Sequence, residues 1–240
     1  MKLLEIYDKL NALSAFELQE KWDNSGLQIG SMSDEVSEIV LSLDLDDELI
    51  ATAKEGTLFI THHPLIFGKL TELNFDAYPA NMIKKMMDKN LKLISMHTNF
   101  DQTHLNAYVA EEILGLTLTS HENFVATADI ESDLDSLSQM IKKRLGLEQL
   151  KMVRCKEQIK SIALCTGSGA SLMGEIQADL FLTGDIKYHD AMTAKSLNLS
   201  MIDIGHFESE CFFSEVLYKE LKDWKISVII SNSKNPFEIA

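Results

Sequence analysis

The chain has 240 residues, of which 45% are hydrophobic and 25% charged, a composition typical of a globular protein with a sizeable core. It carries 22 Lys and Arg residues against 37 Asp and Glu residues, which gives a formal net charge of −15. This charge argues against nucleic acids and anionic membranes as partners, and an anionic substrate would need a concentrated positive centre such as a bound metal ion.

Strands and helices are expected to alternate along the chain. A loop is expected over residues 22–30, where Asn, Ser and Gly are frequent. Helices are predicted over 3–13, 48–54, 78–89, 103–114, 133–147, 170–176, 190–197 and 209–224, and strands over 39–45, 58–61, 91–96, 124–130, 161–166, 179–183, 199–204 and 226–231. The alternation predicts an α/β fold with mostly parallel sheets, in two tightly joined domains over 1–120 and 121–240.

The cysteines and the chain start indicate the compartment. Three cysteines without a CxxC pair favour a reducing environment with buried free thiols. The first ten residues carry charges and do not resemble a signal peptide, and no apolar run reaches the ~18 residues of a membrane span. We therefore expect a cytoplasmic protein.

The two halves of the chain echo one another. LFITHHPLIF in the first half parallels LFLTGDIKYH in the second, and the third predicted strand of each half delivers a histidine, His97 or His206. Each of these histidines is followed four residues later by a carboxylate, Asp101 or Glu210. We predict an internal duplication of a β-α-β unit, with the polar residues gathered beyond the carboxyl ends of the strands.

Adjacent histidines at a strand end indicate a metal site. Neighbours on an extended strand point to opposite faces, so His62 and His63 share one ion only if the chain turns, and they serve two adjacent ions more easily. Pro64 favours a bend there. The simpler alternative is that each histidine is a hydrogen-bonded structural residue. Tyr188, His189 and Asp190 either form a substrate-contacting loop or cap the following helix.

Five motifs carry a family resemblance. WDNSGLQIG, THHPLIFG, SMHTNFD, LTGDIKYHD and GHFESE follow one another from Trp22 to Glu210. In this order they resemble the interacting-factor-three-like family, known in many bacteria as type 2 GTP cyclohydrolase I. The resemblance implies two α/β domains, a dinuclear metal centre and a toroidal homohexamer. It implies the metal ligands His62, His63, Asp101, His206 and Glu210, with Asp101 as the bridging candidate and His97 close to the centre.

The resemblance also implies an activity. GTP would be converted to 7,8-dihydroneopterin triphosphate and formate with the help of two divalent ions, for which Fe, Mn and Zn suit nitrogen and oxygen ligands. His97, Glu208 and His189 are candidates for moving protons. Two alternatives stay open: a metal-dependent phosphoesterase, and a non-enzymatic metal-binding ring that acts as a scaffold.

Overall fold

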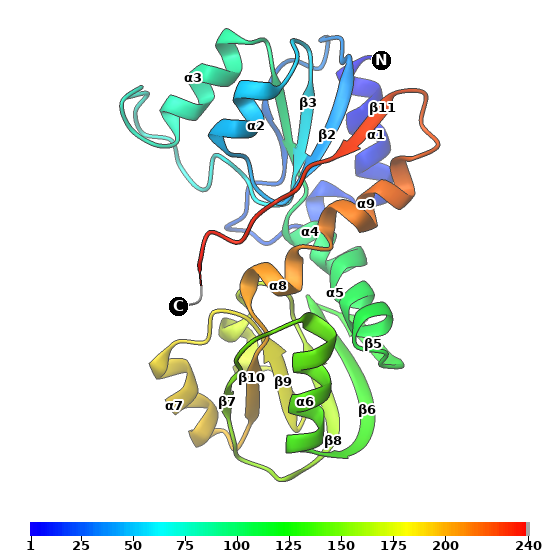
Figure 1. Cartoon of the computed structure of the whole chain (residues 1–240), viewed down its shortest axis with the longest axis vertical. Coiled ribbons are helices and arrows are strands. Elements are labelled where there is room, and N and C mark those ends of the chain that lie inside the picture. Colours follow the sequence, from blue (N-terminus) through cyan, green and yellow to red (C-terminus); the bar gives the residue numbers. More distant parts are fainter. Residues whose placement is uncertain (239–240) are drawn as a thin grey trace. The chain divides into compact units, whose positions relative to one another are not determined.

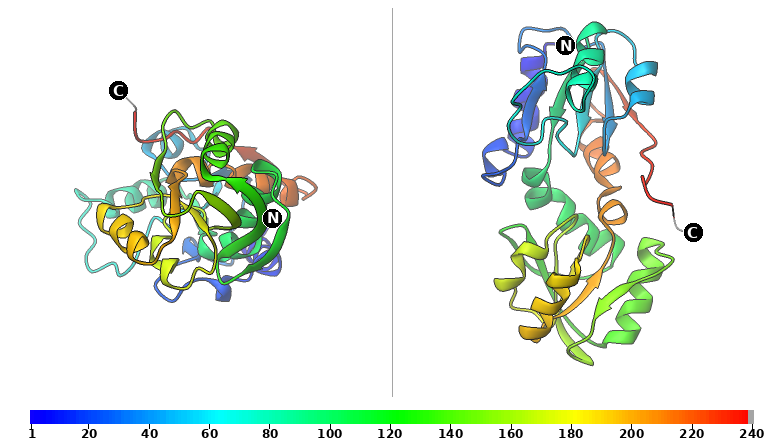
Figure 2. Two further views of the ribbon diagram at one scale, coloured as in Figure 1. Left: turned by 90° about the horizontal axis from the view of Figure 1, so that it is seen from below. Right: turned by 90° about the vertical axis from the view of Figure 1, so that its left-hand side faces the viewer.

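The computed structural model describes residues 1–238 and divides into two compact units. Unit 1 comprises Met1–Phe100 and the C-terminal segment that begins at Phe213, and unit 2 comprises Asp101–Phe212. This differs from the predicted division at residue 120. The C-terminal segment belongs to unit 1 because its strand β11 (Ser227–Ile230) pairs in parallel with β2 (Glu38–Ser42), as Figures 1 and 2 show in red.

The sheet of unit 1 has five strands in the order β1-β4-β3-β2-β11. The central pairs are parallel, as predicted, whereas β1 runs antiparallel to β4. β1 lies within the segment expected to be a loop, because its Gly-, Ser- and Asn-rich surroundings conceal a short pairing strand. The remaining bounds are β1 (Gly26–Ile29), β3 (Leu58–Thr61) and β4 (Lys92–Ser95).

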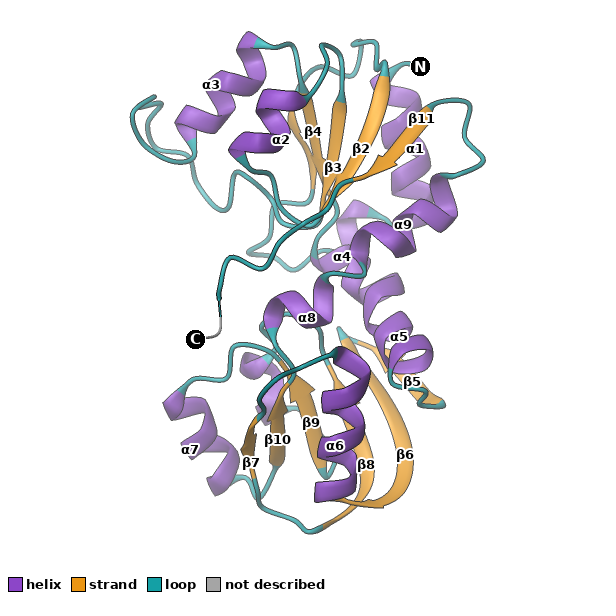
Figure 3. Ribbon diagram, in the orientation of Figure 1, coloured by secondary structure: helices purple, strands orange, loops and turns teal. Residues whose placement is uncertain are grey.

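Helices cover both faces of this sheet, as Figure 3 shows. On one face, α2 (Asp47–Thr52) and α3 (Ala80–Asp88) bury Ile50, Met82 and Met86 against Phe59 and Leu93 of the strands. Successive strand residues alternate between faces, so Leu58 and Ile60 face the opposite side. Figure 1 places α1 (Leu3–Leu13) and α9 (Phe213–Leu221) on that side.

The sheet of unit 2 has six strands in the order β5-β6-β8-β9-β10-β7. Only the β8-β9 and β9-β10 pairs are parallel, so the expectation of mostly parallel pairing is wrong for this sheet. The reason is that β5 and β7, which sequence patterns missed, and β6 join as antiparallel neighbours. The bounds are β5 (Leu118–Glu122), β6 (Val125–Asp133), β7 (Lys151–Val153), β8 (Gln158–Leu164), β9 (Leu180–Thr183) and β10 (Ser200–Asp203).

The two sheets share a strand order. In unit 1 the order β1-β4-β3-β2 places an antiparallel edge strand beside three parallel strands, and β7-β10-β9-β8 does the same in unit 2. In both, the antiparallel strand comes first in sequence. The common order agrees with the predicted duplication, which stays an inference from sequence and topology.

Several predicted helices are interrupted or shorter in the structure. The helix predicted over 209–224 is two helices, α8 (His206–Glu210) and α9, although the segment contains no Gly or Pro to mark the break. The other helical segments are α4 (Thr98–Phe100), α5 (Asn106–Tyr108), α6 (Leu134–Leu145), α7 (Tyr188–Ser196), the π-helical Asp101–Leu105 and Val109–Ile113, and short 3-10 turns at Phe16–Leu18 and Ala170–Gly174. Within residues 1–238, no helix combines the length and apolarity that a membrane crossing requires.

Candidate metal centre

Three imidazoles gather at the carboxyl edge of the first sheet. His62 and His63 follow β3, and His97 follows β4, which is its parallel neighbour. Their ring centroids lie 5.1 to 5.5 Å apart, and one nitrogen from each ring can be chosen so that all three lie within 4.8 Å of one another. The predicted convergence of these side chains is therefore present within unit 1.

The chain turns after β3, which lets adjacent histidines face the same centre. The backbone N–H groups of His62 and His63 donate to Ser42 and Leu43, just past the end of β2. The hydroxyl of Thr61 donates to the carbonyl of His63 at 2.7 Å and closes the turn. His62 is fully buried, whereas the side chain of His63 is 23% exposed, so the pair connects the interior to the surface.

Each imidazole is held through its Nδ1 atom. In unit 1, His62 Nδ1 lies 2.9 Å from the carbonyl oxygen of Met96, His63 Nδ1 lies 2.8 Å from Asp44 Oδ1, and His97 Nδ1 lies 2.8 Å from Asp23 Oδ1. A carbonyl or carboxylate oxygen only accepts, so Nδ1 carries a hydrogen, and in the neutral ring Nε2 then carries the lone pair. Histidines that bind metal ions show this same arrangement, in which an oxygen fixes the tautomer and the ring orientation.

The Asp23 carboxylate is the most strongly held of these oxygens. Burial alone would raise the pKa of its carboxyl group, but hydrogen bonds from His97 and Thr98 and from the Asn24 backbone bring the pKa well below its ordinary value. The Thr98 hydroxyl donates to Asp23 Oδ2 at 2.6 Å, and the Thr98 backbone N–H donates at 3.1 Å. Asp23 is thus a fixed anion behind His97.

Unit 2 holds the predicted carboxylates and the fourth imidazole. His206 and Glu210 lie on α8, four residues apart, with His206 Nε2 3.0 Å from Glu210 Oε2. Two ligand atoms at ~2.0–2.2 Å from one ion lie roughly 3 Å apart or a little more, so this spacing suits a shared cation. His206 Nδ1 is held by Asp185 Oδ2 at 2.7 Å, which repeats the arrangement of unit 1.

Asp101 and Glu210 flank the turn that follows β8. The hydroxyl of Thr166 donates to Asp101 Oδ1 at 3.2 Å, and a Cβ atom at Gly167 would collide with the Glu210 carboxylate. Burial raises the pKa of the Cys165 thiol, and the charges of both carboxylates raise it further. The two buried carboxylates therefore both approach this turn, with one oxygen of each within 4.8 Å of the other, and Gly167 leaves room for Glu210.

The remaining predicted residues lie on α8 and α7. Glu208 is half-buried on α8, two residues before Glu210. His189 is exposed on the first turn of α7, with Tyr188 edge-on at 5.3 Å. Asp190 accepts from the backbone N–H of Lys187 at 3.0 Å, so the capping alternative is confirmed for Asp190.

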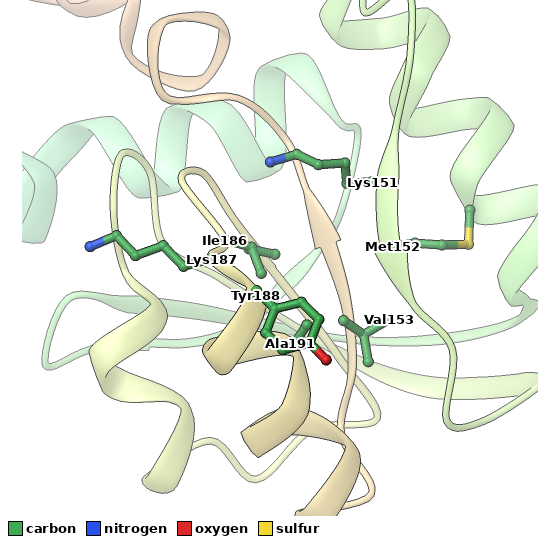
Figure 4. A pocket seen from close by; sticks show the side chains of 7 residues that line it. All are labelled: Lys151, Met152, Val153, Ile186, Lys187, Tyr188 and Ala191. Carbon is green, nitrogen blue, oxygen red and sulfur yellow. The ribbon is translucent and has the colours of Figure 1, made fainter.

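A pocket of about 200 Å³ opens beside the start of α7. Its walls include Tyr188, Lys187 and Lys151, which Figure 4 shows around the mouth, together with Met152, Val153, Ile186 and Ala191. Lys151 pairs with Asp203 at 2.6 Å. None of the lining residues is a histidine, cysteine or carboxylate, so the pocket offers no metal ligand.

Two carboxylates that hold the imidazoles, those of Asp23 and Asp44, were not predicted from the sequence. Asp23 lies in the motif WDNSGLQIG, and Asp44 lies two residues past the end of β2, at the same edge as His63. A carboxylate just past a parallel strand that neighbours the histidine strand was a usable signal for Asp44. Asp23 carried no such signal, because its loop meets His97 only in the folded chain.

Comparisons with known proteins agree with this architecture. The family model described as Duf34/NIF3 (NGG1p interacting factor 3) matches residues 1–236. A Campylobacter jejuni protein named GTP cyclohydrolase 1 type 2 homolog is 49% identical over 239 residues, covering 99% of each chain. A Helicobacter pylori protein named GTP cyclohydrolase 1 type 2 is 45% identical over 239 residues, covering 98% of each chain.

Solved structures show the same fold. The crystal structure of a hypothetical protein from Staphylococcus aureus matches with a TM-score of 0.86 at 26% identity, covering 100% of this chain and 99% of that one. Reduced HcgD from Methanocaldococcus jannaschii matches with a TM-score of 0.82 at 21% identity, covering 97% and 98%. The fold and the clustered imidazoles and carboxylates define an α/β protein with candidate metal ligands. The chain belongs to the DUF34/NIF3 family.

Proposed function

We propose that this protein is a metal-dependent hydrolase that converts GTP to 7,8-dihydroneopterin triphosphate and formate. The names of the Campylobacter and Helicobacter relatives support the substrate. The observation that carries the metal dependence is that four imidazoles each have Nδ1 held by an oxygen and Nε2 left as the ligand atom. Structural histidines have no need of one common tautomer, so this repeated arrangement favours metal binding.

The residues present fit two divalent ions. The proposed ligands are His62, His63, Asp101, His206 and Glu210, and His97 lies beside them in the unit 1 cluster. All are imidazole nitrogens or carboxylate oxygens, a set that suits Fe, Mn or Zn. When bound, the ions would activate water and stabilise the negative charge that develops during hydrolysis. They would also supply the positive charge that GTP needs on a chain of net charge −15.

The covalent chain supports a centre that draws ligands from both units. Asp101 directly follows Phe100, the last residue of the first segment of unit 1. Glu210 lies three residues before Phe213, whose ring centroid is 5.0 Å from that of His62. Three residues span at most about 11 Å, so the covalent link between Glu210 and Phe213 is short.

Proton transfer is proposed for residues beside these ligands. His97 is the best supported, because the Asp23 carboxylate fixes its tautomer and would stabilise the imidazolium form after proton uptake. Glu208 and His189 are retained as candidates, since Glu208 shares α8 with two ligands and His189 begins α7 close in sequence to Asp185. The homohexamer is also a proposal, and sedimentation analysis of the metal-loaded protein tests it.

The direct test is an assay of the metal-loaded protein with GTP. Protein reconstituted separately with Fe, Mn and Zn is incubated with GTP, and formate and the oxidised, fluorescent pterin are measured. The proposal expects both products in equal amounts, their loss on chelation, and their loss in His206→Ala. Phosphate release without formate would point instead to a phosphoesterase, and no product with any of the three metals would contradict the proposed activity.

A further inference from the structure

Two exposed aromatic rings stand beside the imidazole cluster of unit 1. Trp22 is 57% exposed and Phe67 is 63% exposed, yet their ring centroids lie only 5.8 Å apart. Each ring also meets His97 edge-on, with centroids 5.9 Å from Trp22 and 6.2 Å from Phe67. The pair therefore forms an aromatic surface beside the imidazole cluster. Neither ring can bind a metal ion, so the proposed metal centre does not explain this surface.

Hydrogen bonds join the two segments that carry these rings. The side-chain amide of Asn24 donates to the carbonyl of Ile66 at 2.7 Å, and the backbone N–H of Ile66 donates to Gln28 Oε1 at 2.8 Å. Gln28 Nε2 in turn donates to the carbonyl of Asn24. The residues next to Phe67 are thus fastened to the loop that follows Trp22.

The residues on both sides of Trp22 in the sequence are also held by hydrogen bonds. The backbone N–H of Glu20 donates to the Thr98 hydroxyl at 2.9 Å, and Asp23 accepts from both Thr98 and His97. Trp22 therefore lies between two anchored residues and is preorganised while its ring stays in solvent. Phe75, in the same 65–79 segment, is also exposed, and its ring centroid lies 5.8 Å from Lys84 Nζ.

We propose that Trp22 and Phe67 form a stacking platform for a planar heteroaromatic ring, the purine base of the nucleotide substrate. The identity of the nucleotide rests on the function proposed above. The two rings are tilted by 50°, so a base that stacks on the face of one meets the edge of the other. A base held there lies next to His97 and hence to the proposed ions. Asn24 and Gln28 act as positioning residues, since they hold the segments and do not touch the base.

The contribution of stacking to GTP affinity can be measured. Aromatic stacking of a base changes affinity by roughly 5- to 150-fold. Trp22→Ala and Phe67→Ala should each weaken GTP binding to the metal-loaded protein within this range, as measured by equilibrium dialysis. Trp22→Phe keeps a ring and should lose less affinity than Trp22→Ala. The matched control is Phe75→Ala, which removes an exposed aromatic ring from the same segment and should leave GTP affinity unchanged.

Fluorescence provides a readout that does not depend on catalysis. The chain has two tryptophans, so in Trp224→Phe the emission reports Trp22 alone. GTP and guanosine should quench this emission with saturation, whereas inorganic tripolyphosphate should not. Circular dichroism and sedimentation of every variant test whether fold and oligomeric state are retained.

The outcomes separate the platform from the proposed reaction. Quenching with weakened binding in Trp22→Ala and Phe67→Ala supports the platform even if no formate appears. Formate release with unchanged GTP affinity in both variants overturns the platform and leaves the reaction standing. Absence of quenching by GTP and guanosine also overturns the platform. So does a change of oligomeric state in Trp22→Ala or Phe67→Ala with unchanged nucleotide binding, because the two rings would then form an interface between copies of the chain.

Discussion

Nδ1 of His97 donates a hydrogen bond to Asp23 Oδ1 over 2.8 Å, and His63 has the same relationship with Asp44. In both pairs an anion fixes the proton on Nδ1 and makes Nε2 the more basic nitrogen. Such anions raise the ability of imidazole to bind a metal ion. The carboxylates behind the imidazoles are therefore expected to affect metal affinity although they bind no ion themselves.

Replacing Asp44 by Ala should weaken metal binding. The substitution removes the oxygen that orients His63, and losses of such partners typically cost about 10- to 100-fold in affinity. Asp44 is a better choice than Asp23, because Asp23 also accepts bonds from Thr98 and its loss would disturb the loop. Competition with a chelator of known affinity measures the change.

The control for Asp44→Ala is Asp47→Ala. Asp47 is an exposed carboxylate of the same unit, and it pairs with Lys85 rather than with an imidazole. This variant loses the same charge but should retain full metal affinity. Equal weakening in both variants would mean that net charge, not orientation of His63, governs binding.

Gly167→Ala should disturb the position of Glu210. Gly167 has φ +61°, and a Cβ there would collide with the Glu210 carboxylate, which must then move. We expect a destabilisation of about 1 kcal/mol from the left-handed backbone, together with a loss of metal occupancy. Urea unfolding and metal analysis measure the two effects separately.

Gly146→Ala is the matched control for that substitution. Gly146 has φ +68°, but no atom lies within 4 Å of the added Cβ. Gly146→Ala should lower the free energy of unfolding by a similar amount and leave the metal occupancy unchanged. If both variants bind metal equally well, the close approach of Glu210 to residue 167 has no part in the centre.

The thiols should differ in reactivity. Burial, and then the carboxylates of Asp101 and Glu210, raise the pKa of Cys165, so its thiolate is scarce at neutral pH, whereas Cys211 is exposed. The expectation of buried thiols thus holds for Cys165 and not for Cys211. Iodoacetamide should label Cys211 in the folded protein and Cys165 only after unfolding, as followed by peptide mass spectrometry. Rapid labelling of Cys165 in the folded protein would contradict its burial.

Asp179 should contribute a pH-dependent part of the stability. A hydrogen bond from Lys156 is the main reason that the pKa of Asp179 lies below its ordinary value of 3.8. The folded state therefore gains stability above this pH and loses it as the pH falls through the lower folded value. Asp179→Asn should lower the free energy of unfolding by about 1 kcal/mol at pH 7, and the difference should vanish in strong acid. A constant difference between pH 7 and pH 2 would contradict this.

The cluster of histidines at the strand ends was predictable from the sequence, whereas the elements and residues that hold these histidines in place were not. His62, His63 and His97 follow apolar β-branched runs, and parallel neighbours bring such ends together, so periodicity alone indicated the cluster. β1 was missed because four residues with Gly at the start resemble a loop, and only pairing with β4 makes them a strand. The sheet that a strand joins also depends on contacts between segments far apart in the sequence. For this reason β11, which follows the second domain in sequence, was expected to belong to that domain.

The site shows the same division. Asp185 lies two residues past the end of β9, where polar residues were expected to gather, and it holds His206. Asp23 holds His97 from a loop 74 residues earlier in the chain, and the sequence gives no sign of that partnership. The room that Gly167 leaves for the Glu210 carboxylate likewise appears only in the folded protein.

Metal content per chain tests the central claim most directly. Wild-type protein, loaded with Fe, Mn or Zn and dialysed, is measured by mass spectrometry of its metals beside His62→Ala and Glu210→Gln. The account predicts two ions per wild-type chain with at least one of these metals, and fewer in both variants, because His62 and Glu210 are both among the proposed ligands. Wild-type protein that retains no ion, or variants that retain the full complement, would contradict it.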